Sequence, residues 1–132
     1  MISYLINQLA LAGFNLINSR IDAYRIMRNK TIAHGINFGA YMVFVGLLCW
    51  LGRYDIWDVM LLAISAYTNR QFTFDIPLNL RRGLEWDYVS KANPPKSITD
   101  RFEIWLFGYN GRAPFLLYGT VWGICLMIKI LS

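Results

Sequence analysis

The charged residues between Phe74 and Tyr88 are the densest group of side chains in this sequence with the types needed for catalysis. A membrane enzyme acting on lipid head groups would use a carboxylate as general base and an arginine clamp on phosphate. The residues available for those roles are Asp75, Arg81, Arg82, Glu85 and Asp87. Glu85 and Asp87 lie two apart and so on different sides of a helix, whereas Arg81 and Glu85 lie four apart and can pair on its surface. We therefore assign no catalytic residue and expect a non-enzymatic role, with the lipid enzyme as the rival hypothesis.

His34 and Asp58 are two further ionisable residues that lie in or beside apolar runs. Ionisable groups inside a membrane are costly and often functional, so both are candidates for an ion or proton relay. The simpler hypotheses place His34 at head-group depth and Asp58 in a first helical turn, where the helix dipole favours a carboxylate. No histidine or acid lies at metal spacing to His34, so the sequence predicts neither a metal site nor a cofactor.

The composition indicates that lipid is the solvent of this chain. The 132 residues are 56% hydrophobic and 16% charged, whereas about 25% of the residues in a soluble domain are charged. The formal charge is +5, but the thirteen Lys and Arg residues form no single run. An anionic lipid surface explains these cations without nucleic acid. We expect a single membrane domain over residues 1–132, located as a multi-pass protein in the cell membrane.

Three apolar segments, 31–52, 56–74 and 113–131, are the candidate membrane spans. The first contains no formally charged residue, and at about 1.5 Å per residue it reaches roughly 33 Å, enough to cross a hydrocarbon core of about 30 Å. The second follows a very short loop, Gly52 to Asp55, and must return as a hairpin. The predicted fold is therefore all-α, with about three transmembrane helices and additional amphipathic interfacial helices.

Residues 1–30 and 75–112 are the predicted interfacial parts. The first is an amphipathic helix lying along the membrane or the bundle. It carries a basic collar, Ser19 to Lys30, in which Asp22 lies within reach of Arg25. In the second, Asp75 to Pro77 predicts a helix start, and Ser97 to Asp100 resembles a capping box opening a short amphipathic helix. The charge rule places the collar and residues 75–112 together on the cytoplasmic side.

Two sets of residues are predicted to mediate contacts. Cations next to the spans are expected to bind anionic lipid, namely Arg25, Arg28, Lys30, Arg81 and Arg82. Glycines at spacings of four and seven let another helix backbone come close, and these helix-packing candidates are Gly35, Gly39, Gly46, Gly119 and Gly123. Since two of these pairs form GxxxG motifs in different spans, we expect the first and last spans to pack together or against copies of the chain.

These features favour a small structural or assembly subunit of a homo-oligomer or a larger membrane complex. Its expected partners are a bilayer with anionic lipids and copies of itself or other membrane subunits, and not nucleic acid. A third hypothesis is a pore-forming assembly, because the short spans and brief loops are similar in general build to phage holins. Holins commonly end in a charged tail, whereas this chain ends Lys-Ile-Leu-Ser.

Overall fold

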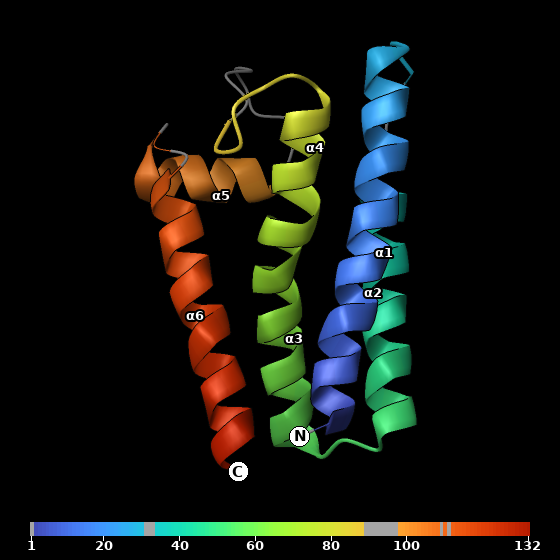
Figure 1. The fold of residues 1–132 in the computed structure, drawn as a ribbon, viewed down its shortest axis with the longest axis vertical. Coiled ribbons are helices and arrows are strands. Elements are labelled where there is room, and N and C mark those ends of the chain that lie inside the picture. The colour runs from blue at the N-terminus through green and yellow to red at the C-terminus, as the bar shows by residue number, and fades with distance from the viewer. Residues whose placement is uncertain (1, 31–33, 89–97, 109, 111) are drawn as a thin grey trace.

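The computed structural model describes residues 2–30, 34–88, 98–108, 110 and 112–132. Over these residues the predicted all-α class is confirmed, with no strand. Long helices run side by side in alternating directions, and one short helix lies across an end of the bundle (Figure 1). The elements are α1 (Ile2–Met27), α2 (His34–Gly52), α3 (Ile56–Arg70), the π-helix η1 (Gln71–Asp75), α4 (Ile76–Arg81), α5 (Ile98–Phe107) and α6 (Arg112–Leu131).

The α2–α3 hairpin and α6 form close to where the apolar segments predict them. Arg53 adopts a positive φ of 49° in the tight turn. Asp55 then caps α3 by accepting a hydrogen bond from the backbone N–H of Asp58 at 2.8 Å. Within the described residues, α6 is the one helix long and apolar enough to cross a membrane, and Ile36–Gly52 is a shorter apolar helix.

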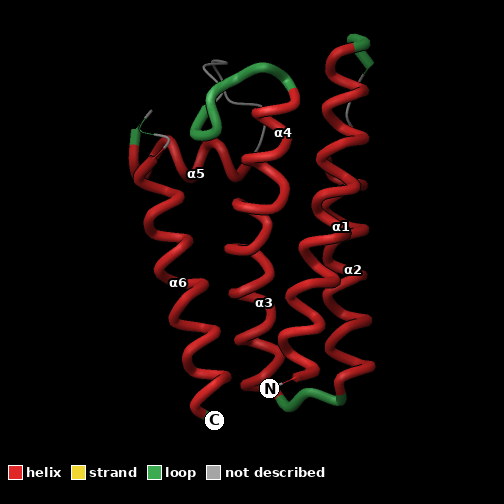
Figure 2. The backbone as a smooth tube through the Cα atoms, in the orientation of Figure 1, coloured by secondary structure: helices red, strands yellow, loops and turns green. Residues whose placement is uncertain are grey.

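The predicted helix start at Asp75 to Pro77 is wrong, because the helix that forms in the second apolar segment does not end there. α3, η1 and α4 form one continuous helical rod (Figure 2). Asp75 has helical backbone angles, and the N–H of Ile76 bonds to the carbonyl of Gln71, five residues back. Proline lacks an N–H and its ring crowds the preceding turn. The wider π turn just before Pro77 accommodates the ring without breaking the rod.

Helix α1 lies lengthwise along the bundle and packs against α3, η1 and α4. Its inward face is mostly polar, with the buried residues Tyr4, Asn7, Gln8, Leu11, Asn15, Ser19, Asp22 and Ala23. Its large apolar side chains point outward instead, namely Ile2, Leu5, Ile6, Leu9, Leu16, Ile17, Ile21, Tyr24 and Met27. The amphipathic helix is thus present along the bundle, and the polar face is the one that packs.

Helices α6 and α2 lie on different sides of the bundle. α6 packs on α3, while α2 packs on α1 and α3 away from α6 (Figure 1). The apolar core lies where α1, α2 and α3 meet, and its members are Tyr4, Leu11, Tyr41, Val45, Leu48, Leu62 and Ala66. The expectation that the first and last spans pack together is therefore wrong within one chain, because α1 and α3 separate them.

Candidate functional site

A chain of buried hydrogen bonds runs between α1 and the α3–η1 rod, and we call it the polar ladder. Its members are Tyr4, Gln8, Asn15, Ser65, Asn69, Thr73 and Trp122. Near the N-terminus of α1, the Ser65 hydroxyl accepts hydrogen bonds from Tyr4 Oη and Gln8 Nε2, both at 2.7 Å. The same hydroxyl donates to the carbonyl of Leu62 at 3.1 Å. All of the hydrogen-bonding capacity of Ser65 is thus used inside the bundle.

Gln8 is the centre of the polar ladder because it joins three helices. Its Oε1 accepts from Asn69 Nδ2 at 3.0 Å and from Trp122 Nε1 on α6 at 3.1 Å. The ladder continues through Thr73, whose hydroxyl donates to Asn69 and accepts from Asn15 Nδ2 at 3.0 Å. A buried polar group that lacks a partner is costly. These bonds therefore fix the register of α1 against α3 and attach α6 to both.

Asp22 is buried on the inner face of α1, where it contacts α2. Both of its carboxylate oxygens accept from Asn37 Nδ2, at 3.1 and 3.0 Å. The predicted pair with Arg25 is not formed, because the carboxylate points into the bundle and only 3% of Asp22 is exposed. The basic collar therefore keeps Arg25 available for another anion.

Asp58 lies in the first turn of α3, as predicted, and also has a partner that the sequence did not indicate. Its carboxylate forms an ion pair with Lys129 Nζ on α6 at 2.7 Å, and both side chains are largely buried. Residues 58 and 129 are 71 positions apart, so no local spacing signals this contact. His34 begins α2, but its side chain lies outside the described residues.

The charged residues between Phe74 and Tyr88 are divided between the rod of η1 and α4 and the turn that follows it. α4 ends at Arg81, and the chain turns at Gly83, which has a φ of 72°. The predicted pair of Arg81 with Glu85 is wrong for that reason. Arg81 instead donates to the carbonyl of Leu16 and the hydroxyl of Ser19 on α1.

Asp87, an acid of this cluster, has its partner on α6. Asp87 pairs with Arg112 at 2.9 Å. No group of three or more His, Cys, Asp or Glu residues that could hold a metal occurs in the part of the chain that the structure describes. Arg81 thus joins α4 to α1, and Asp87 joins the segment after α4 to α6.

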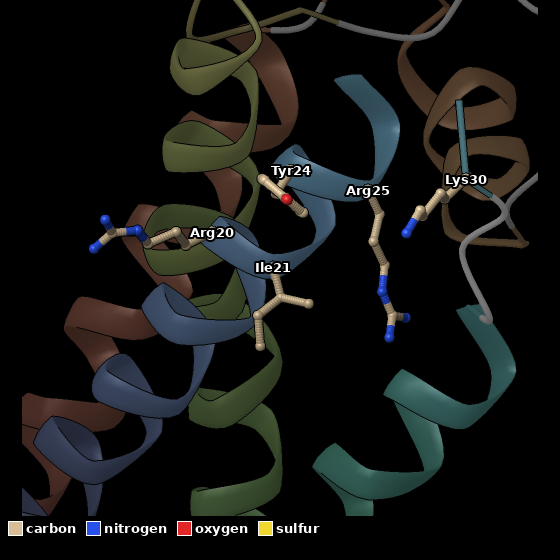
Figure 3. Close-up of a pocket in the computed structure, with 5 residues that line it drawn as sticks. All are labelled: Arg20, Ile21, Tyr24, Arg25 and Lys30. Carbon is tan, nitrogen blue, oxygen red and sulfur yellow. The ribbon is translucent and has the colours of Figure 1, made fainter. Parts of the chain in front are cut away.

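The five cations predicted to bind lipid lie in different environments. Arg25 and Lys30 line one surface pocket with Arg20, Ile21 and Tyr24 (Figure 3). Arg28 stacks on the Tyr24 ring, with its guanidinium carbon 4.3 Å from the ring centroid. Arg82 lies over Tyr88, and Arg81 is held by α1. Arg20, absent from the predicted set, also lines the pocket, from the other side of Tyr24.

The glycines separate into open and packed positions. A Cβ atom added at Gly39, Gly46 or Gly123 would meet nothing within 4 Å, whereas one at Gly119 would approach the Phe72 ring to 3.2 Å. The side chain of Tyr41 and the other core residues of α2 lie on the opposite side of that helix from Gly39 and Gly46. Gly119 therefore serves the contact of α6 with η1, while Gly39 and Gly46 face outward. Gly35 lies outside the residues described at side-chain level.

No family model, curated protein or solved structure matches this chain.

Proposed function

We propose that this protein is a small multi-pass membrane protein that acts as an assembly subunit of a homo-oligomer or a larger membrane complex. One observation carries the membrane part of the proposal: about half of the buried described residues are polar or charged, whereas many large apolar side chains are exposed on the outside. In water, each exposed Å² of apolar surface costs about 25 cal/mol, whereas in lipid it costs little. Lipid is the solvent in which this distribution is favourable.

The same reasoning makes α1 a fourth span, rather than a helix on the membrane surface. Its polar residues find their partners in the bundle, and its apolar residues face outward along the length of the rod. About 18 to 20 helical residues cross a hydrocarbon core of roughly 30 Å. In α1 that length extends from Ile2 to about Arg20, where the basic residues begin. We propose four spans with residues 2 and 132 on one side.

The charge distribution supports placing the α4–α5 end in the cytoplasm. The collar lies at the same end of the bundle as α4 and α5 (Figure 1). At the opposite end, Arg53 and Lys129 are matched by Asp55 and Asp58. Cytoplasmic flanks carry the excess of Lys and Arg, which the collar end provides.

A cysteine-labelling experiment tests this topology. In a variant with Cys49 and Cys125 replaced by alanine, single cysteines at Ser3 and Asp55 should react with an impermeant reagent in intact cells. One at Glu85 should react only after the membrane is opened. If Ser3, like Glu85, reacts only after the membrane is opened while Asp55 reacts in intact cells, α1 lies on the cytoplasmic side and only three spans remain.

The assembly role is supported by the open glycine face of α2. Gly39 and Gly46 lie on the side opposite the core, and no atom of the described residues comes within 4 Å of the position that a Cβ atom would take. Such a face lets a second helix backbone approach closely in lipid. The rival hypotheses have less support, because Asp87 pairs with Arg112 on α6 and the polar face of α1 is used inside the fold rather than facing a pore.

Substitution of the glycines separates assembly from folding. Gly39→Leu and Gly46→Leu should leave the helical content and thermal stability of the subunit unchanged and should lower the mass of the purified particle in mild detergent. Gly119→Leu should destabilise the subunit itself, because the new side chain meets Phe72. The matched control is Ala40→Leu, which adds similar bulk to an exposed position on another side of α2. An unchanged particle mass in both outward variants would contradict the assembly role.

A further inference from the structure

The outer surface of α1 is hollowed at the basic end of the bundle. The pocket has a volume of about 370 Å³ and is lined by Arg20, Ile21, Tyr24, Arg25 and Lys30. In Figure 3 the side chains of Arg25 and Lys30 converge on one space beside Ile21, and Arg20 extends on the other side of Tyr24. Of the described residues that line it, three are cations and none is acidic. The pocket therefore has the charge of an anion site.

The fold prevents the nearest acid from neutralising these cations. Asp22 is three positions before Arg25, but its carboxylate is held by Asn37 inside the bundle. Like charges that converge repel each other. An anion bound between Arg25 and Lys30 replaces that repulsion with attraction, and arginine is well suited to a phosphate because its donors form a planar fork.

The apolar lining distinguishes a lipid from a free anion. Ile21 is 45% exposed and continues toward the membrane centre into Ile17, which is 63% exposed. Tyr24 is exposed beside them and its ring is held by Arg28. Tyrosine is enriched at membrane interfaces, where its ring lies at head-group level. A phospholipid can contact both the cations and the apolar side chains, with its phosphate at the cations and its acyl chains along Ile21 and Ile17.

We propose that this pocket binds the head group of an anionic phospholipid. The phosphate contacts Arg25 and Lys30, Arg20 adds a third positive charge at the rim, and the acyl chains lie along the outer face of α1. This inference rests on the proposed membrane location and goes beyond it by naming a site. Arg81 and Arg82 are not part of the site, because Arg81 bonds to α1 and Arg82 lies over Tyr88.

The test uses the full chain in nanodiscs of phosphatidylcholine containing a minor fraction of phosphatidylglycerol. Native mass spectrometry after release into mild detergent measures the phosphatidylglycerol that each protein retains. The Arg25→Gln, Lys30→Gln variant should lose roughly tenfold or more in affinity, since each cation near a membrane surface contributes about 1 kcal/mol. The control is Arg82→Gln with Arg53→Gln, which removes the same charge outside the pocket and should change retention less than twofold.

The other outcomes separate this site from the proposed function. Equal losses in the two double variants would mean general charge attraction and would overturn the site. Competition by soluble glycerol phosphate as strong as that by phosphatidylglycerol would overturn the lipid assignment. Both results leave the membrane location standing. Failure of the unmodified chain to insert into phosphatidylcholine vesicles, measured by flotation, would overturn the membrane location and the lipid site together.

Discussion

Replacing Gln8 with leucine should lower the free energy of unfolding by about 2 kcal/mol, although it makes the chain more apolar. The Trp122 indole would lose its acceptor and the Ser65 hydroxyl would lose a donor. A buried polar group left without its partner costs about 1–3 kcal/mol. A hydrogen bond between membrane helices contributes about 0.6 kcal/mol on average, and the substitution removes three such bonds, to Ser65, Asn69 and Trp122. The measurement is unfolding in mixed micelles, followed by circular dichroism.

The adjacent residue supplies the control. Leu9 is 73% exposed on the outer face of α1, so Leu9→Ala should cost less than about 0.5 kcal/mol if that face contacts lipid. A larger loss in Leu9→Ala than in Gln8→Leu would mean that α1 packs by its apolar face. That result would contradict the polar ladder and the argument for a fourth span.

Breaking the ion pair between Asp58 and Lys129 should also cost about 2 kcal/mol. The Asp58 and Lys129 side chains are 26% and 18% exposed, so the pair is neither fully buried nor fully exposed. A solvent-exposed pair contributes about 0–1 kcal/mol, and breaking a fully buried pair costs about 3–5 kcal/mol. The expected cost lies between these two values. Asp58→Asn leaves the Lys129 charge without its partner at the contact of α3 with α6. The expected result is weaker attachment of α6 to the bundle.

A double-mutant cycle isolates that interaction. Combining Asp58→Asn with Lys129→Met should recover about 1 kcal/mol relative to the sum of the single losses, because neither charge is then left alone. The pair of Asp87 with Arg112 is the internal control, since the Arg112 side chain is 72% exposed. Its disruption by Asp87→Asn should cost at most about 1 kcal/mol. Additive losses at Asp58 and Lys129 would contradict an energetic role for the buried pair.

The sequence determined the parts of this protein that depend on local pattern. The apolar runs gave the positions of α2 and α6, and the short loop from Gly52 to Asp55 required a hairpin. The apolar period of α1 indicated an amphipathic helix, because a helix repeats every 3.6 residues whatever it packs against. The first-turn place of Asp58 followed from the same local information. The collar and the α4–α5 segment were expected on one side, and they lie at one end of the bundle.

The tertiary structure decided what each face contacts. Amphipathic spacing is the same whether the polar face meets water or a neighbouring helix, so α1 alone did not reveal that its polar residues point inward. The partners of Gln8, Asp22, Asp58 and Arg81 lie on other helices, and contacts at such separations leave no local pattern. Proline at position 77 predicted a helix start from local rules, but the π turn before it allowed the rod to continue. Chain folding, and not spacing, therefore assigned Gly119 to a contact within the chain and left Gly39 and Gly46 open to a partner.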